Sequence, residues 1–399
     1  MKFTEFKFHP SLEEGIAAMG FENATPIQEL AIPIVLEGKD IIGCAQTGTG
    51  KTAAFLLPIM QHVLQNNHNG VAALVIVPTR ELAVQIDQQV EGLGYFTGVG
   101  SVAIYGGSDG TSFEQEKQAL TGGTDIIIAT PGRLIAHLNL GYVKFNTIKF
   151  LVLDEADRML DMGFYEDLVK IVNHLPKDRN NLLFSATMPP KIRKLANQIL
   201  KDPEEVNIAI SKPAEGVVQG AFMVYENQKI GLIAHLLSAR KMESVIVFCS
   251  TKKAVTQVTA ALKHKELKVG GISSDLEQKD RENILRQFKN GEIEVLVATN
   301  IMARGIDVDG IELVINYAVP RDAEEYVHRV GRTARANNQG IAFTLITEDD
   351  QNDFGKIEEL IGYEIRKLPA PSNLGETPQY SPGKGSSKGG FKRYSRRRK

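Results

Sequence analysis

The sequence predicts an α/β protein with two tandem domains, each a parallel β-sheet covered by helices, followed by a basic tail. Short apolar runs alternate with helix-like stretches over most of the chain, a pattern typical of parallel sheets buried on both faces. The pattern breaks around residues 207–220 and then starts again. The length of 399 residues also exceeds what one domain usually holds.

Apolar runs in the first half of the chain predict buried strands at residues 72–77, 125–129, 150–153 and 182–184. Helix-like stretches precede or follow them, at residues 53–64, 81–93, 133–138 and 190–200. Because these strands are apolar throughout, we expect helices on both faces of the sheet. We place the first domain at residues 1–208.

The same alternation returns in the second half of the chain. It predicts strands at residues 244–248, 294–298, 313–317 and 341–346, and helices at residues 252–264, 323–330 and 351–360. We place this domain at residues 221–368 and a linker at residues 209–220, where Pro213 and Gly216 interrupt any period. Beyond Pro369 the composition shifts to Pro, Gly, Ser and Lys, so we expect a disordered tail at residues 369–399.

The near-zero net charge of the chain hides an uneven distribution. Lys and Arg number 46 and Asp and Glu number 48, but residues 383–399 hold eight Lys or Arg and no acid. The other 382 residues therefore carry 38 basic and 48 acidic side chains. A segment of Gly, Ser, Lys and Arg cannot bury enough apolar surface to fold, and it typically binds a polyanion. We expect nucleic acid as a partner, and a solubilising end is the alternative.

The cysteine content and the hydropathy of the chain indicate the cellular compartment of the protein. Cys44 and Cys249 are far apart in sequence and cannot form a disulfide framework, which favours a reducing compartment. No run approaches the roughly 18 apolar residues that a membrane-spanning helix needs, and the charged first residues do not resemble a secretory signal. We therefore expect a cytoplasmic protein that makes no membrane contact.

Residues 45–52 read AQTGTGKT and lie between an apolar segment and a helix-like stretch, as in a phosphate-binding loop. Gly48 and Gly50 let backbone N–H groups approach phosphate oxygens. Lys51 would reach the β- and γ-phosphates, and Thr52 would bind Mg²⁺. The strict pattern of a phosphate-binding loop begins with glycine, whereas this chain has Ala45 at that position. The alternative interpretation of the segment is a glycine-rich turn that binds no nucleotide. The predicted nucleotide-binding residues of the loop are Ala45, Gln46, Thr47, Gly48, Thr49, Gly50, Lys51 and Thr52.

An acidic group follows the strand expected at residues 150–153, where the chain reads FLVLDEAD. The carboxyl ends of parallel strands are where α/β folds bind ligands. Asp154 would hold Mg²⁺, largely through water, and Glu155 would orient or deprotonate the attacking water. The alternative is an acid-rich helix start, which the helix dipole favours on its own.

Together, residues 154–157 (DEAD) and 45–52 resemble the corresponding blocks of the DEAD-box RNA helicases of superfamily 2, in their bacterial form. The resemblance covers about residues 1–368. It implies two RecA-like domains and an RNA-dependent ATPase that uses ATP and Mg²⁺. It also implies RNA as the partner, contacted mainly through the sugar–phosphate backbone, and a monomeric state.

The segment at residues 20–28, GFENATPIQ, resembles the Q motif of this family. By this resemblance Gln28 reads the adenine edge, which suits an amide that both donates and accepts hydrogen bonds. Thr25 belongs to the same motif. Phe3 matches an upstream aromatic residue that packs against the base; taken alone, it is an anchor of the N-terminal core.

Three blocks after predicted strands resemble the RNA-gripping blocks of the family: residues 78–82 (PTREL), 106–107 (GG) and 130–133 (TPGR). Each block taken alone is weak evidence for RNA binding, because such turns are common in proteins. Two further blocks lie in the second domain, at residues 247–251 (VFCST) and 299–307 (TNIMARGID). The RNA-binding residues that the resemblance implies are Thr79, Arg80, Gly107, Thr130, Arg133, Thr251 and Thr299.

Arginines recur every three residues at the end of the helix expected at residues 323–330, as Arg329, Arg332 and Arg335. On one helix face they would repel each other unless they met an anion; a solvated basic face is the alternative. By resemblance Arg332 and Arg335 are arginine fingers for the γ-phosphate. Asp307 would hold the ATP ribose.

The resemblance also implies residues that couple hydrolysis to closure of the two domains. Ser185 and Thr187 form the Ser-Ala-Thr block, whose hydroxyls can bond the acidic motif and the opposite domain; a helix cap is the alternative. His328 and Arg329 would bridge to these blocks. The chain departs from the family pattern at Asn300, Ala334, Ser273–Ser274 and Ala318, and none of these departures removes a phosphate, metal or finger ligand. The charge lost at Asn300 puts interdomain or RNA coupling in question rather than ATP hydrolysis.

The function that these observations predict is an ATP-dependent RNA helicase. Binding of ATP and RNA would close the two domains, and closure would locally unwind a short duplex or remodel an RNA–protein complex without processive movement. An ATP-gated RNA clamp with little unwinding is the alternative. A P-loop ATPase that acts on DNA fits less well, because the Q motif and the DEAD block point to RNA.

Overall fold

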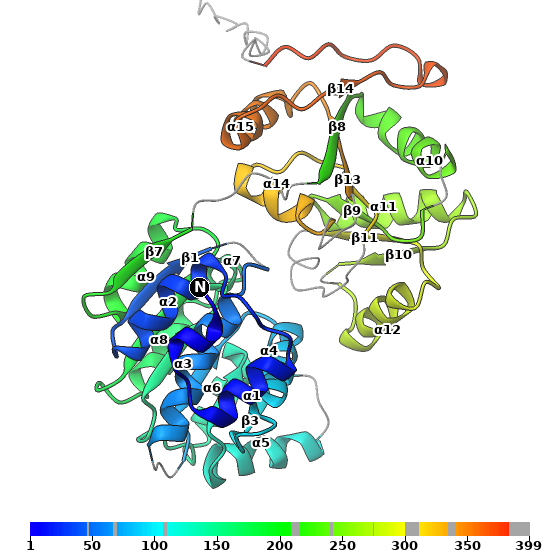
Figure 1. Ribbon diagram of the computed structural model, residues 1–399. Helices are drawn as coiled ribbons and strands as arrows, with labels where there is room; N and C mark the ends of the chain where they lie inside the picture. Colours follow the sequence, from blue (N-terminus) through cyan, green and yellow to red (C-terminus); the bar gives the residue numbers. More distant parts are fainter. Residues whose placement is uncertain are drawn as a thin grey trace, which may run out of the picture. The chain divides into compact units, whose positions relative to one another are not determined.

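The computed structural model describes residues 1–45, 48–66, 70–106, 110–239, 242–273, 275–299, 311–333 and 340–382. These residues form two compact units, one within residues 1–208 and the other within residues 216–382 (Figure 1). Each unit holds a seven-stranded sheet in which every strand pairing is parallel. The predicted fold class is confirmed. No helix in the described part of the chain is long and apolar enough to cross a membrane.

The sheet of the first unit has the strand order β3-β4-β2-β5-β6-β1-β7. Its strands are β1 (Ile41–Cys44), β2 (Ala73–Ile76), β3 (Ser101–Ile104), β4 (Ile126–Ala129), β5 (Phe150–Leu153), β6 (Asn180–Ser185) and β7 (Glu204–Asn207). Its helices are η1 (Phe3–Phe6), α1 (Pro10–Ala18), α2 (Pro26–Leu36), α3 (Lys51–Gln65), α4 (Arg80–Gly94), α5 (Gly110–Gly122), α6 (Pro131–Asn139), α7 (Ala156–Asp161), α8 (Tyr165–Asn173) and α9 (Pro190–Ile199).

Helices cover both faces of this sheet, as its wholly apolar strands require. In β2, Ala73 and Val75 join the core beneath α1, α2, α3 and α4. Leu74 and Ile76, which point the other way, join the core beneath α6, α7, α8 and α9. The short turns at the carboxyl ends of the strands are therefore left to carry polar side chains.

The sheet of the second unit has the strand order β10-β11-β9-β12-β13-β8-β14. Its strands are β8 (Val217–Met223), β9 (Val245–Cys249), β10 (Val269–Ile272), β11 (Val295–Thr299), β12 (Leu313–Asn316), β13 (Gly340–Ile346) and β14 (Lys367–Leu368). The helices described are η2 (Glu226–Gln228), α10 (Lys229–Ala239), α11 (Lys252–Lys263), α12 (Gln278–Lys289), α14 (Ala323–Val330), α15 (Gln351–Ile361) and η3 (Ser372–Leu374).

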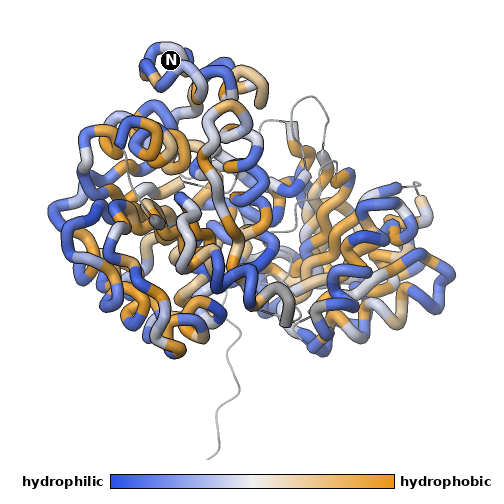
Figure 2. The backbone as a smooth tube through the Cα atoms, turned by 90° about the horizontal axis from the view of Figure 1, so that it is seen from below, coloured by the Kyte–Doolittle hydropathy of each residue, from blue (hydrophilic) through white to orange (hydrophobic). Residues whose placement is uncertain are grey.

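Apolar side chains fill the interior of the second unit in the same way. Residues from β9, β11 and β12 pack with the apolar faces of α10 and α11 in one core. Helices α14 and α15 pack against each other, and α14 also contacts β12. Figure 2 shows the hydrophobic residues gathered along the strands in both units, while the outer faces of the helices are largely hydrophilic.

The linker expected at residues 209–220 is shorter than predicted. Strand β8 begins at Val217 and pairs with β13, with Val217 opposite Gly340. Residues 209–215 lie outside the described residues. Pro213 and Gly216 disguise the start of the strand in the sequence, whereas the β-branched Val217 and Val218 favour pairing with the neighbouring strand. The second unit therefore starts before residue 221.

The disordered tail predicted from residue 369 is wrong for residues 369–382. The amide of Gln228 donates hydrogen bonds to the carbonyl oxygens of Leu374 and Glu376, each at 2.8 Å. The Tyr380 hydroxyl donates to Glu358 Oε2 at 2.6 Å. These contacts with side chains of the folded unit order a segment that has few apolar residues of its own. Residues 383–399 lie outside the described residues.

Candidate functional site

Two glycines shape the phosphate loop between β1 and α3. Gly48 has φ 84° and Gly50 has φ 89°, in the left-handed region that favours glycine. A Cβ atom on Gly50 would lie 2.4 Å from the side-chain nitrogen of Gln28. Another residue at position 50 would therefore be strained and would also displace Gln28. Gln46 and Thr47 of the loop lie outside the described residues.

Lys51 is the first residue of α3, and its side chain folds back over the loop. The Nζ atom donates a hydrogen bond to the carbonyl oxygen of Ala45 at 2.7 Å, and the residue is only 6% exposed. Thr52 follows in the first turn of the helix, and both residues line the same cavity. A cation and a hydroxyl at the start of a helix suit a phosphate with a metal ion beside it.

Gln28 links the start of α2 to the phosphate loop. Its side-chain oxygen accepts a hydrogen bond from the backbone N–H of Thr25 at 2.8 Å, and its Nε2 donates to the Gly50 carbonyl at 3.0 Å. Phe3 is 4% exposed and stacks on Phe21, with 5.8 Å between ring centroids. Phe3 thus belongs to the core while its edge lines the cavity.

Asp154 follows β5 directly and is 3% exposed. Burial raises the pKa of its carboxyl to about 6, and the nearby Lys51 opposes this shift. Such a carboxylate gains from a divalent cation, which would keep it ionised. Mg²⁺ usually takes one or two protein oxygens and completes its shell with water and phosphate oxygens. The pair of Asp154 and Thr52 in one cavity therefore fits a hydrated Mg²⁺.

Glu155 adopts an unusual backbone conformation at the start of α7. Its φ and ψ are 50° and 49°, a left-handed conformation that costs of order 1–3 kcal/mol for such a residue. Its side-chain Oε2 accepts a hydrogen bond from Arg158 Nη1 at 3.0 Å. Arg158 is 2% exposed. The strained backbone and the buried arginine together fix the direction of the Glu155 carboxylate.

Asp157 connects the acidic block to the Ser-Ala-Thr block. Its Oδ2 accepts hydrogen bonds from the backbone N–H of Thr187 at 3.2 Å and from the Thr187 hydroxyl at 3.1 Å. The Ser185 hydroxyl accepts one from the Asp157 N–H, at 3.2 Å. The expected bonds between these hydroxyls and the acidic motif are therefore present. The coupling role of Ser185 and Thr187 stays a prediction.

One cavity of about 360 Å³ brings the Q motif, the phosphate loop and the acidic block together. Its lining residues are Phe3, Phe21, Asn23, Thr25, Gln28, Gly48, Gly50, Lys51, Thr52, Ala53, Leu82, Gln89, Asp154 and Glu155. Three of them, Ala53 on α3 and Leu82 and Gln89 on α4, were not expected at a nucleotide site from the sequence. The residues come from η1, the Q motif, the phosphate loop, α3, α4 and the turn after β5, all in the first unit. They combine an aromatic wall with a cation and two carboxylates.

The RNA-binding candidates of the first unit lie at the carboxyl ends of β2 and β4, which are neighbours in the sheet. Thr79 caps α4 and accepts a hydrogen bond from the Leu82 N–H at 3.4 Å, and Arg80 is the first residue of that helix. Thr130 precedes α6 in the same way. Gly107 lies outside the described residues.

Arg133 has a carboxylate partner that the sequence did not indicate. Its Nε donates to Glu116 Oε2 at 2.7 Å, and its guanidinium lies 4.8 Å from the centroid of the Phe113 ring. The same Glu116 oxygen is 2.7 Å from His137 Nε2. The side chain of Arg133 is 16% exposed. An RNA phosphate that bound Arg133 would compete with Glu116.

In the second unit, Thr251 caps α11 and accepts a hydrogen bond from the Ala254 N–H at 3.1 Å. Thr299 is the last residue of β11, directly opposite Cys249 in the neighbouring strand. Both candidates therefore lie at the carboxyl edge of this sheet. Among the other predicted site residues and family departures, Ser274, Asn300, Asp307, Ala334 and Arg335 lie outside the described residues.

The prediction that Arg329 and Arg332 share one helix face is wrong. Helix α14 ends at Val330, with Gly331 as its C-cap, and Arg332 lies beyond the helix. The cause is a bridge between Thr333 and Ile311, which takes the chain out of the helix. Arg335 lies outside the described residues, and His328 is in the last turn of α14.

Arg329 is 3% exposed and is held within its own unit. It donates hydrogen bonds to Asn316 Oδ1 at 3.3 Å and to the Ala318 carbonyl at 3.0 Å, and it pairs with Glu325. Ala318, one of the departures from the family pattern, thus supplies a backbone acceptor. These contacts brace α14 against the end of β12.

The chain is similar in sequence to known proteins. The family model described as DEAD/DEAH box helicase matches residues 25–195, and the one described as helicase conserved C-terminal domain matches residues 228–337. The ATP-dependent RNA helicase CshA of Listeria monocytogenes is 42% identical over 372 residues, which cover 93% of this chain and 71% of that protein. The DEAD-box ATP-dependent RNA helicase CshA of Geobacillus kaustophilus is 41% identical over 371 residues, which cover 93% of this chain and 79% of that protein.

Solved structures of similar proteins include S. cerevisiae Dbp5 bound to RNA and ADP BeF3, with a TM-score of 0.80 and 30% sequence identity. That match covers 92% of this chain and 95% of the other. A structure of Mss116p bound to ssRNA and AMP-PNP has a TM-score of 0.79 and 29% identity, and the match covers 93% of this chain and 80% of the other.

Proposed function

The chain belongs to the family of DEAD/DEAH box helicases and is an RNA-dependent ATPase, and we propose that it couples ATP hydrolysis to local, non-processive unwinding of short RNA duplexes or to remodelling of RNA–protein complexes. The observation that carries this proposal is the single cavity lined by Gln28, Lys51, Asp154 and Glu155. A nucleotide there would have its base near Phe3 and its phosphates at the start of α3.

In this proposal, each residue of the cavity has a distinct task. Gln28 recognises adenine, and Lys51 exchanges its hydrogen bond with Ala45 for one with a phosphate oxygen. Thr52 and Asp154 would hold Mg²⁺, largely through water, and the ion would neutralise charge on the phosphate oxygens. Glu155 orients the attacking water and accepts its proton. Arg158 keeps the Glu155 carboxylate in place.

RNA would be gripped through its backbone by the residues at the carboxyl ends of the strands. The proposed contacts are Thr79, Arg80, Gly107, Thr130, Arg133, Thr251 and Thr299. Hydroxyls, backbone groups and arginines of this kind bind phosphates and 2′-hydroxyls without reading the bases. We therefore expect little sequence selectivity, a preference for RNA over DNA and steep weakening by salt. The eight basic residues of segment 383–399 would add affinity.

The second unit would complete the ATP site when the two domains close. Asp307 would bind the ribose, and Arg332 and Arg335 would stabilise the γ-phosphate in the transition state. Ser185, Thr187, His328 and Arg329 would transmit the state of the nucleotide between the domains. A monomeric state and a cytoplasmic location stay predictions.

The test is to measure ATP turnover with and without RNA, together with displacement of a duplex of about ten base pairs, short enough for local unwinding. We expect RNA to stimulate turnover and ATP to drive strand displacement. Absence of RNA stimulation would overturn the proposal, and stimulation without displacement would favour an ATP-gated clamp.

Glu155→Gln is the matched variant for this test. The amide keeps the size of the side chain and can still accept a hydrogen bond from Arg158, but it cannot take a proton from water. We expect ATP and RNA binding to persist while turnover is lost by about a hundredfold or more. Turnover at the wild-type rate would show that Glu155 is not the base.

A further inference from the structure

The two sheets have the same topology, strand for strand. In chain order, β1 to β7 of the first unit occupy the same sheet positions as β8 to β14 of the second. Strand β8 is therefore the counterpart of β1, which leads into the phosphate loop. Strand β12 is likewise the counterpart of β5, which leads into the acidic block.

A lysine begins the helix that follows each of the two equivalent strands. Lys51 is the first residue of α3 after β1, and Lys229 is the first residue of α10 after β8. Both side chains are buried, with 6% and 2% exposure. The two lysines thus occupy the same position in the topology, although the second unit has no glycine-rich loop before its helix.

The residues after β5 and β12 also correspond. The backbone N–H of Asp154 donates to the carbonyl oxygen of Ile76 at the end of β2, and that of Tyr317 donates to Phe248 in the equivalent strand β9, both at 3.0 Å. In the second unit an aromatic residue therefore replaces the carboxylate that we assign to Mg²⁺. The Lys229 ammonium lies 4.8 Å from the centroid of the Tyr317 ring.

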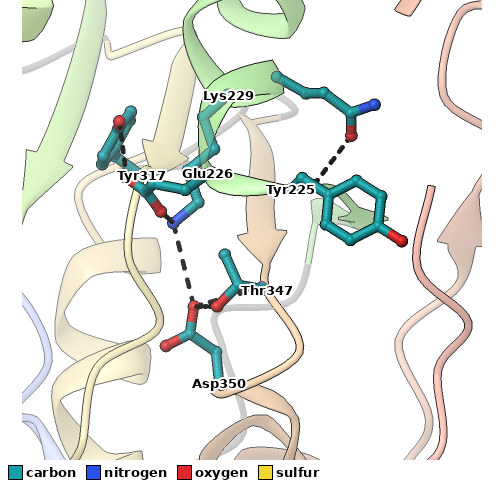
Figure 3. Close-up of polar contacts among 7 residues, drawn as sticks. Tyr225, Glu226, Lys229, Tyr317, Thr347 and Asp350 are labelled. Carbon is teal, nitrogen blue, oxygen red and sulfur yellow. Dashed lines mark hydrogen bonds and ion pairs between the residues drawn. The ribbon is translucent and has the colours of Figure 1, made fainter. Parts of the chain in front are cut away.

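Carboxylates surround Lys229 where phosphate would meet Lys51 (Figure 3). Lys229 Nζ is 2.8 Å from Glu226 Oε2 and 3.9 Å from Asp350 Oδ2. The other oxygen of Glu226 accepts a hydrogen bond from the Tyr317 hydroxyl at 2.9 Å. Asp350 in turn accepts bonds from Thr347, at the carboxyl end of β13. One carboxylate, that of Glu226, joins the lysine to the residue that replaces Asp154.

We propose that Glu226 fills the second unit's counterpart of the phosphate position and so excludes nucleotide from that unit. The proposal rests on the proposed function, because it takes Lys51 as a phosphate ligand. Glu226 supplies to Lys229, from within the chain, the anion that a phosphate would supply to Lys51. The sheet edge of the second unit is thereby kept for other contacts.

The exposure of Lys229 and Glu226 fits this role. Lys229 is almost fully buried, so its charge needs an anionic partner within reach. The side chain of Glu226 is 66% exposed and forms the outer side of the pair. Removal of the Glu226 carboxylate would open Lys229 to small anions from solution. If the Glu226–Lys229 pair had only a structural role, the same change would remove the ion pair without creating a site for anions.

The experiment uses the full chain in a Lys51→Ala background, in which the first site is disabled, and inorganic triphosphate as the probe. Titration calorimetry should detect weak or no binding to K51A and a gain of at least about tenfold in affinity for K51A/E226A, as expected for one charge-assisted contact. Adding Lys229→Met should remove this gain. The probe should also raise the thermal midpoint of K51A/E226A more than that of K51A.

Asp353→Ala in the same background is the matched control. Asp353 pairs with Lys356 at 2.7 Å on the surface of α15, so its removal also exposes a lysine of the second unit. We expect no gain in triphosphate affinity from this change. Circular dichroism identifies variants that have lost their fold, and Glu226→Gln, which keeps the shape of the side chain, replaces E226A where needed.

Two outcomes would overturn the proposal: no gain in affinity for folded E226A or E226Q variants, or a gain that survives Lys229→Met. The failure of the proposed function has a different signature. It would show in K51A alone, as ATP binding equal to that of the unmodified chain.

Discussion

Asp157 receives two hydrogen bonds from Thr187, one from its backbone and one from its side chain, at 3.2 and 3.1 Å. The two residues belong to different strand ends, after β5 and β6, and are 30 positions apart in the chain. Any change in the acidic block that moves Asp157 must therefore move the Ser-Ala-Thr block as well. We predict that this contact transmits the state of the bound nucleotide from the acidic block to the Ser-Ala-Thr block.

Thr187→Val keeps the shape of the side chain and removes the hydroxyl donor. We expect ATP binding to be preserved, strand displacement per ATP to fall severalfold, and the free energy of unfolding to fall by about 1–3 kcal/mol, because the lost bond has a charged acceptor. Thr97→Val is the control, since its hydroxyl bonds the Gly94 carbonyl at 3.0 Å away from the cavity. Equal displacement per ATP in T187V and T97V would contradict the coupling role.

Arg158→Lys tests whether the buried arginine positions Glu155. Lysine keeps the charge but loses the planar donor group that meets Glu155 Oε2 at 3.0 Å. We expect kcat for ATP hydrolysis to fall about tenfold or more, with KM for ATP nearly unchanged, since only the direction of the base is disturbed. Arg193→Lys, at an exposed pair with Glu205, should leave kcat unaltered. An equal loss in both variants, or a change confined to KM, would rule out this role.

The raised pKa of Asp154 predicts how stability depends on pH. The folded pKa is about 6 and the unfolded value is 3.8, so the folded protein binds more protons between these values. Stability contributed by this group is therefore lost as the pH rises from about 4 to about 6. Without nucleotide or metal, Asp154→Asn should be more stable than the unmodified chain at pH 7, by at most about 3 kcal/mol.

Urea denaturation at several pH values measures this difference. The gap between D154N and the unmodified chain should shrink as the pH falls from about 6 to about 4, and it should approach zero only below about pH 3, where the Asp154 carboxyl is protonated in both states. Asp178→Asn, at an exposed carboxylate paired with Lys149, serves as the control and should show no such gain at pH 7. A constant gap across the whole pH range would show that the effect does not come from titration of Asp154.

Glu116→Gln releases Arg133 from its carboxylate partner while keeping a hydrogen-bond acceptor. We expect RNA affinity to rise, and the slope of log affinity against log salt concentration to steepen by about 0.7, the effect of one added phosphate contact to a single strand. Glu114→Gln is the control, because Glu114 lies on the same helix and pairs with Lys117 at 3.5 Å instead. Weaker RNA binding in E116Q than in E114Q would mean that Glu116 holds Arg133 in its binding position.

The parts of the site that the sequence predicted are those whose residues sit directly after apolar strands. Lys51 and Asp154 could be placed because a run of buried residues ends at a polar motif in both cases. Strands β7, β8 and β14 were not predicted, and no bounds were predicted for β3 and β10. Both are short edge strands, and Ser101 in one and Gly270 and Gly271 in the other break up the apolar pattern.

Two residues that hold a predicted site residue in place gave no signal in the sequence. Glu116 and Arg158 are ordinary charged residues on helices: Glu116 is 17 positions from its partner Arg133, and Arg158 is only three positions from Glu155. The spacing of the arginines could not predict the residue at which α14 ends. The periodic arginines continue past Val330, but the pairing of Thr333 with Ile311 decides where the helix stops.

The ordered segment that ends at residue 382 has a consequence for the seventeen residues beyond it. The side chain of Gln351 donates a hydrogen bond to the Gln379 carbonyl and accepts one from the Ser381 N–H, and these two bonds hold the end of the ordered segment on the second unit. Even fully extended, seventeen residues span at most about 60 Å. In the proposed function their eight positive charges would act at an effective concentration of about millimolar on RNA held by the second unit. Capture of such an RNA would then be an intramolecular event.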